Sequence, residues 1–198
     1  MKVQSMMVAT GFLMVVLSAC GGTTTPTAVS GNNSNGGSKT VVTPSAPPDL
    51  APSADEQRIL DEVNAARAVA RNCGSTHYDA TTPLTWNALL AAAALRHTQD
   101  MAYNGYREAS AQEPDAPHTG SDGSTPQQRI TATGYGWRVS GENVAAGYAL
   151  ADMVTAWLNS PGHCQNIMNP KFREIGISYM SYRGAKYNTF YTQDFGVR

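Results

Sequence analysis

The chain has 198 residues, a formal net charge of −1, 41% hydrophobic residues and 8% aromatic residues. This length suits one domain with flanking segments, and the apolar and aromatic content excludes a chain that is disordered throughout. The near-neutral charge excludes the basic footprint of a nucleic-acid binder, so we expect no nucleic-acid partner. Three cysteines leave one sulfur outside any internal disulfide.

Residues 1–19 have the pattern of an export signal. Met6 to Leu17 is an apolar stretch that is too short to span a bilayer, and small residues follow it. The sequence Leu17-Ser18-Ala19-Cys20 resembles the lipobox of bacterial lipoproteins, in which the cysteine carries the lipid. An ordinary secretory signal that is cleaved after Ala19 is the alternative.

Lipidation of Cys20 by acyl chains such as palmitate would hold the exported protein on a membrane. Gly21 follows the cysteine, where Asp would signal retention in the inner membrane. The lipoprotein resemblance therefore implies the outer membrane if the source is Gram-negative. The partners expected on this basis are the membrane, through the anchor, and a ligand or component of the cell envelope.

A polar segment separates Cys20 from the rest of the chain. Residues 21–54 are rich in Gly, Ser, Thr, Asn and Pro and cannot bury enough apolar area to fold. We therefore predict three parts: a lipoprotein signal peptide at 1–19, the lipidated cysteine and a disordered linker at 20–54, and one domain at 55–198.

Helical patterns dominate the first half of the predicted domain. Ser53 and Glu56 have the spacing of a capping box, and the helix that they begin is predicted to end at Asn72-Cys73-Gly74. A turn at 83–87 leads into a second helix over 87–103. Two further helices are predicted, one from Thr125-Pro126 onward and one over 151–159.

Strand patterns dominate the second half. Residues 138–145 are strand-like, and 175–182 and 187–195 form a predicted hairpin around Arg183 to Lys186. Helices followed by a terminal hairpin favour an α+β fold, in which helices cover an antiparallel sheet.

Four segments combine chemically useful side chains with turn residues: His118 to Gly123, Gly141 to Ala145, Trp157 to Pro170, and Tyr191 to Gly196. In this order and spacing, from about Gln57 to Gly196, they resemble the CAP superfamily of cysteine-rich secretory, antigen 5 and pathogenesis-related proteins, also called SCP-like. The resemblance is to the bacterial secreted branch. It implies an α-β-α sandwich with a three- or four-stranded antiparallel sheet between helical layers.

The resemblance also implies a cleft that contains His118, Glu142 and His163. Neutral imidazoles suit a divalent metal such as zinc, and a nearby carboxylate can orient an imidazole or help to hold water. The expected metal ligands are therefore His118, His163 and Glu142. Ser160 stands where many members have a second glutamate, so the carboxylate pair used in two-acid catalysis is missing.

Each of these residues has a structural alternative. His118 could be an exposed loop residue, Glu142 could bind backbone amides of a loop, and His163 could cap a short helix. His77 and His97 lack motif support and are interpreted as structural or exposed.

Other conspicuous side chains are given structural roles. For Asp194 an edge or turn role is favoured over orienting a group in the cleft. The tryptophans are interpreted as core anchors rather than a carbohydrate platform: Trp86, Trp137 and Trp157.

Cys73 and Cys164 remain once Cys20 carries lipid. An exported compartment permits a disulfide between them, which would pin the loop after His163 to the end of the first helix. The alternative is two free thiols, with Cys164 a nucleophile beside His163.

Three functions fit the sequence. The favoured one is a membrane-anchored protein whose His/Glu cleft binds a small or lipid-like ligand, a divalent metal, or both. The second is an envelope hydrolase, protease-like, that uses either a metal-activated water at His118 and His163 with Glu142 as base, or Ser160 activated by His163. The third is a non-catalytic surface interaction module. The sequence favours binding over catalysis.

Overall fold

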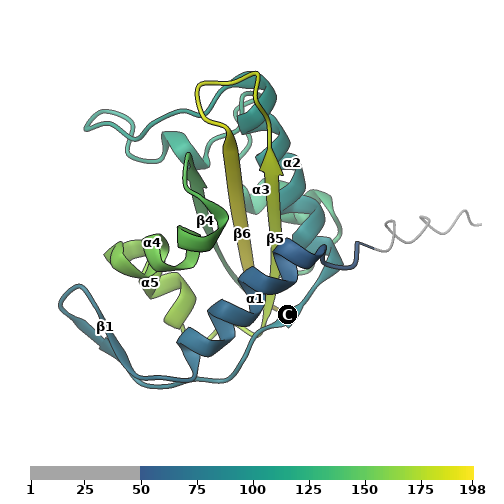
Figure 1. Ribbon diagram of the computed structural model, residues 1–198. Helices are drawn as coiled ribbons and strands as arrows, with labels where there is room; N and C mark the ends of the chain where they lie inside the picture. The colour runs from purple at the N-terminus through teal and green to yellow at the C-terminus, as the bar shows by residue number, and fades with distance from the viewer. Residues whose placement is uncertain (1–49) are drawn as a thin grey trace, which may run out of the picture. The chain divides into compact units, whose positions relative to one another are not determined.

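A four-stranded sheet forms the centre of the computed structural model, which describes residues 50–198 (Figure 1). The strand order is β3-β5-β6-β4, and the long strands β4 (Val139–Ala146), β5 (Glu174–Ser181) and β6 (Thr189–Val197) are antiparallel neighbours. The short β3 (Thr85–Trp86) pairs in parallel with β5, within a segment that was predicted to be only a turn. The α+β prediction is confirmed. The signal sequence, Cys20 and most of the linker lie outside the described residues.

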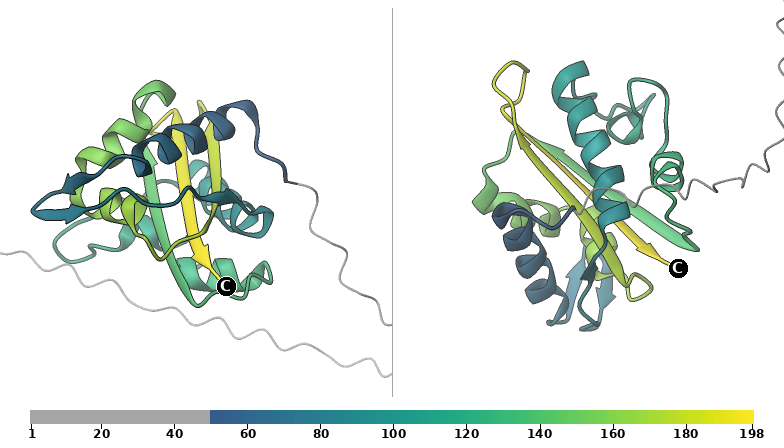
Figure 2. Two further views of the ribbon diagram at one scale, coloured as in Figure 1. Left: turned by 90° about the horizontal axis from the view of Figure 1, so that it is seen from below. Right: turned by 90° about the vertical axis from the view of Figure 1, so that its right-hand side faces the viewer.

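Helical layers cover both faces of the sheet (Figure 2). On one face, α1 (Ala54–Arg67), α4 (Met153–Asn159) and α5 (Pro161–Met168) enclose the largest apolar cluster. On the other face lie α2 (Ala88–Asn104) and α3 (Pro126–Ala132). Two short 3-10 helices, η1 (Ala116–His118) and η2 (Leu150–Asp152), precede α3 and α4. This is the α-β-α sandwich that the resemblance implied.

Local capping signals set the starts of three helices. The Ser53 hydroxyl accepts a hydrogen bond from the backbone N–H of Glu56, whose carboxylate accepts from the backbone N–H of Ser53 at 2.9 Å. Thr125 and Gln128 form the same reciprocal pair at α3, and the Asn87 side chain caps α2. These bonds satisfy backbone donors that have no partner within the helix. The predicted helix starts are therefore confirmed here.

The end of the first helix was predicted wrongly. α1 ends at Arg67, and the following residues form a hairpin of β1 (Arg71–Cys73) and β2 (Thr76–Tyr78). Gly74 sits at the turn with a φ of 64°, a backbone conformation that glycine adopts without strain. The glycine that suggested a helix stop is thus a hairpin turn.

The disulfide between Cys73 and Cys164 is confirmed. Their Cα atoms lie 5.4 Å apart, and the bond joins β1 to α5. Both residues are buried in the main apolar cluster. The free-thiol alternative, with Cys164 as a nucleophile, is therefore excluded.

α2 lies unusually close to the sheet at Gly176. A Cβ atom at this position would stand 1.9 Å from the backbone nitrogen of Ala91, so a larger residue would push the helix away. The close approach brings the middle of α2 against β6, where the Thr98 hydroxyl donates to the Thr192 hydroxyl at 2.9 Å. The sheet face beneath α2 therefore carries buried polar side chains.

The tryptophans divide into two groups. Trp157 is buried in the main core, and the partly buried Trp86 packs against it, so these two anchor the core as expected. Trp137 is 37% exposed, which contradicts the prediction. Tyr135 takes the buried place in that turn, with its ring on Gly196 and its hydroxyl donating to Glu174 at 2.6 Å.

No helix among residues 50–198 is long and apolar enough to cross a membrane.

Candidate functional site

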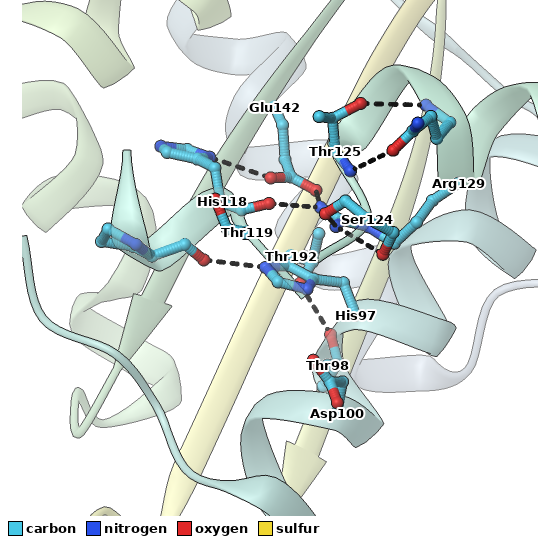
Figure 3. A network of polar contacts seen from close by, with 12 residues as sticks. His97, Thr98, Asp100, His118, Thr119, Ser124, Thr125, Arg129, Glu142 and Thr192 are labelled. Carbon is cyan, nitrogen blue, oxygen red and sulfur yellow. Dashed lines mark hydrogen bonds and ion pairs between the residues drawn. The ribbon is translucent and has the colours of Figure 1, made fainter. Parts of the chain in front are cut away.

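The centre of the candidate site is the side chain of Glu142 on β4, of which 1% is exposed (Figure 3). Its Oε1 lies 2.8 Å from Nδ1 of His118, which ends η1. Its Oε2 accepts a hydrogen bond from Nη2 of Arg129 on α3 at 2.7 Å. Both carboxylate oxygens are engaged, and the carboxylate fixes the orientation of the His118 ring.

Arg129 organises the loop that carries His118. Besides Glu142, the guanidinium donates to the backbone carbonyl of His118 at 3.0 Å and to that of Ser124 at 2.8 Å. Its side chain is 1% exposed, and such burial of a cation requires these partners. Sequence reasoning missed Arg129, because an arginine on a short helix is ordinarily a solvated side chain and no motif marked it.

The charges around Glu142 favour its ionised form. Burial alone would raise the pKa of this carboxyl, but the hydrogen bond from His118 and the charges of His97, Arg129 and His118 together hold the pKa below its ordinary value. The Glu142–Arg129 contact is therefore a buried ion pair.

A second carboxyl, Asp194, lies opposite Glu142 in the pairing of β4 with β6. It is fully buried, and neither of its oxygens has a hydrogen-bond partner within residues 50–198. Burial, and then the negative charge of Glu142, raise the pKa of Asp194 well above its ordinary value. Ionising both carboxyls side by side is unfavourable, so Asp194 keeps its proton to a higher pH than an ordinary aspartate does. The interpretation of Asp194 as an edge or turn residue was wrong.

His97, which had been interpreted as structural or exposed, is buried beside this group. Its Nε2 lies 2.8 Å from the carbonyl of Pro117, and burial lowers the pKa of the imidazole. His97 therefore supports the segment that leads into His118, whereas His77 lies exposed near Asn72 and Asp79 on the β1–β2 hairpin.

His163 and Ser160 lie at the start of α5, in a neighbouring pocket of about 330 Å³. Burial, and then the charge of His118, lower the pKa of His163, so this imidazole is neutral at physiological pH. His118 and Glu142 line a different pocket of about 410 Å³. The four predicted site residues thus occupy two pockets that both reach β4.

An amide network that the sequence analysis missed joins α5 to β4. The Asn166 side chain donates to the carbonyl of Glu142 at 3.1 Å and to the Asn143 side chain at 2.9 Å. Asn143 donates in turn to the carbonyl of His163 at 3.2 Å and to Gln193 at 3.1 Å. These bonds fix the position of the His163-bearing segment relative to β4. The Gly-Glu-Asn stretch contained this signal, since its asparagine follows the site glutamate directly.

The predicted three-ligand metal site does not fit this geometry. Within the part of the chain that the structure describes, no three His, Cys, Asp or Glu side chains are grouped so that they could hold a metal ion. Glu142 has both oxygens committed to His118 and Arg129. It orients His118 rather than supplying a third ligand.

Replacing Asp194 with asparagine is expected to change how stability depends on pH. The folded wild type holds a proton on Asp194 above the pKa of the unfolded carboxyl, so its stability falls as the pH rises from about 4. Asp194→Asn removes this loss, and its free energy of unfolding should rise relative to wild type between pH 4 and 8. Urea unfolding at several pH values measures the difference. A constant difference across this range would contradict the assignment.

The sandwich, with histidines from two segments and a buried glutamate on β4, defines a CAP or SCP-like domain. Residues 60–195 match the CAP family, described as the cysteine-rich secretory protein family, and the chain belongs to this family.

Among proteins similar to this chain is the uncharacterized protein YkwD of Bacillus subtilis (strain 168), which is 30% identical over 143 residues. That match covers 72% of this chain and 48% of YkwD, so the chain spans about half the length of this relative.

Solved structures of similar proteins have the same fold. An extracellular protein containing an SCP domain from Bacillus anthracis str. Ames is 27% identical, with a TM-score of 0.56 over 73% of this chain and 40% of that one. An outer surface protein from Borrelia burgdorferi is 22% identical, with a TM-score of 0.56 over 73% of this chain and 92% of that one. The second likeness supports the fold alone.

Proposed function

We propose that this protein is a lipid-anchored, extracytoplasmic CAP-domain protein that binds a small, lipid-like ligand in the pocket beside His163. The observation that carries the proposal is the pocket itself, whose volume of about 330 Å³ falls in the range of small-molecule sites. Apolar side chains line one part of its wall: Val144, Ala145, Ala146, Met153, Ala156 and Trp157.

Polar side chains also line this pocket. Ser160 and the neutral His163 line the pocket and offer hydrogen bonds without a net charge. Tyrosine rings complete the lining: Tyr106, Tyr148 and Tyr187. An amphiphile with a short acyl chain and a polar head matches this division into apolar and polar surface.

The proposed anchor is Cys20 in its lipobox sequence, with the outer membrane as the destination if the source is Gram-negative. An extracellular protein with an SCP domain, 27% identical to this chain, supports export. Mass spectrometry of the protein from membranes tests this proposal, because acyl chains should be present on Cys20 and absent after Cys20→Ser.

Binding is favoured over hydrolysis by the state of the polar groups. Glu142 is committed to an ion pair and a hydrogen bond, so it is unavailable as a general base. Activation of a serine nucleophile requires a hydrogen bond between its hydroxyl and a base. Within the described residues, the Ser160 hydroxyl makes no such bond with His163.

Titration with decanoate tests the proposed ligand class. The full-length chain with Cys20→Ser is used, so that the protein's own lipid does not compete. We expect saturable heat in calorimetry and at least about a tenfold loss of affinity in Ala156→Phe, because the ring fills the pocket. Ala151→Phe, an exposed position nearby on η2, is the matched control and should bind like the parent protein.

Weaker binding in His163→Ala would support the placement of the head group. Absence of saturable binding at millimolar decanoate would overturn the proposed ligand class. Equal affinities of the two phenylalanine variants would show that decanoate binds elsewhere and would overturn the proposed pocket.

A further inference from the structure

Trp137 lies on the surface in a place that the proposed ligand pocket does not use. Its indole N–H donates to the Thr131 hydroxyl at 3.0 Å, which holds the ring against α3. The ring borders a shallow depression of about 470 Å³, whose lining is Gln127, Gln128, Thr131, Ala132 and Trp137. The 37% exposed indole is thus a fixed aromatic surface beside amide and hydroxyl side chains.

This depression adjoins the pocket beside His118, because Gln127 lines both. Nearly all of that pocket's lining carries hydrogen-bonding side chains: Asp115, His118, Thr119, Thr125, Gln127 and Glu142, with Pro126 as the exception. Figure 3 shows Thr119 and Thr125 beside the His118–Glu142 pair. An aromatic platform and a polar pocket are thus joined across the start of α3.

The two parts match the two kinds of surface on a sugar ring. One face of a pyranose carries C–H groups that stack on an aromatic ring, and its hydroxyls both donate and accept hydrogen bonds. Amide and hydroxyl side chains such as Gln127 and Thr125 have the same dual capacity. A purely apolar ligand would leave these groups without partners at a cost in affinity.

The charges of the surface disfavour an anionic ligand. The guanidinium of Arg129 is bonded to Glu142 and two backbone carbonyls, so it is not available to a ligand anion. Asp115 lines the pocket and would repel an acidic sugar. The net charge of −1 offers no general attraction for polyanions.

We propose that the surface from Trp137 across Gln127 to His118 binds a neutral glycan chain, with one sugar stacked on Trp137 and the next in the pocket beside His118. This site is separate from the pocket proposed for the lipid-like ligand, and its occupant differs in chemistry. Either proposal can therefore fail without the other.

Calorimetric titration of the full-length chain carrying Cys20→Ser with two neutral hexasaccharides tests the glycan site. One is the β-1,4-linked hexamer of N-acetylglucosamine and the other is the hexamer of glucose. Saturable binding of either supports the proposal, and a preference for the first assigns the acetamido-bearing glycans as the source. Trp137→Ala should lower the affinity at least about tenfold, whereas Trp137→Phe, which keeps an aromatic platform, should lower it about threefold or less.

Two matched variants separate the site from general surface effects. Gln127→Ala should weaken binding several-fold, because Gln127 joins the two halves of the surface. Tyr103→Ala removes another exposed aromatic ring, 58% exposed, that lines neither half and should leave the affinity unchanged.

Fluorescence gives an independent readout. Trp137 is the most exposed of the three tryptophans, so bound glycan should protect the wild-type fluorescence from acrylamide quenching. Absence of saturable binding to both neutral hexamers at millimolar concentration would overturn the proposal. So would unchanged affinity in Trp137→Ala, or binding restricted to the acidic hexamer of galacturonic acid.

Discussion

Breaking the Cys73–Cys164 disulfide is expected to lower the free energy of unfolding by about 4–5 kcal/mol. The bond spans a sequence separation of 91 residues, and the unfolded chain regains the conformational entropy of that loop when the bond is absent. The same bond holds α5, which carries His163 and Asn166, to β1. Reduction should therefore loosen the proposed ligand pocket as well as the fold. Urea unfolding of the full-length protein, with and without reductant, measures the stability difference.

The control for this experiment is the variant with both Cys73→Ala and Cys164→Ala. It should have the low stability of the reduced protein and should not respond to reductant. Cys20 is present in both proteins, so it does not account for a difference between them. Equal unfolding midpoints for oxidised and reduced wild type would contradict the expected loss. A response of the double variant to reductant would mean that the effect arises elsewhere.

The parts of the fold that were predicted from sequence depend on short-range interactions. Ser53 with Glu56, and Thr125 with Gln128, identify helix starts because both members of each capping box lie within one turn. The turn at Gly74 shows the limit of such signals. A glycine can stop a helix or turn a hairpin, and pairing of the flanking residues decided the outcome.

The residues that sequence analysis missed depend on which elements meet in three dimensions. Along β6, Thr192, Asp194 and Gly196 share one face, which looks polar enough to face solvent. α2 covers that face because Gly176 lets the helix approach closely. The pairing of β4 with β6 then places Asp194 opposite Glu142. This pairing joins strands that are not consecutive, so no local pattern could have indicated the pair.

The candidate site, like the fold, was predicted only in part from the sequence. His118 and Glu142 were correctly placed together, since their nitrogen and oxygen atoms lie 2.8 Å apart. Glu142 does not fit the predicted role of a third metal ligand, because its other oxygen accepts a hydrogen bond from Arg129. Trp137 was misassigned for a related reason: only the structure shows that Tyr135 takes the buried place in that turn.

Arg129→Met is expected to lower the free energy of unfolding by about 3–5 kcal/mol, because it removes the guanidinium that is paired with the buried carboxylate of Glu142. Methionine is apolar and similar in length to arginine, so packing is largely preserved. It also removes the donors to the carbonyls of His118 and Ser124, which frees the loop between η1 and α3. Urea unfolding at neutral pH gives the stability, and the chemical shifts of His118 report the loop.

A matched arginine and a double variant decide whether the buried charge causes the loss. Arg96→Met breaks an ion pair with Asp122 in which both side chains are about half exposed, and should cost much less stability because solvent screens the pair. Adding Glu142→Gln to Arg129→Met removes the uncompensated charge and should recover a large part of the lost stability. If the double variant is as unstable as the sum of the single variants, the two side chains do not interact and the ion pair is not the source of the stability. Equal losses from Arg129→Met and Arg96→Met would likewise contradict a special role for burial.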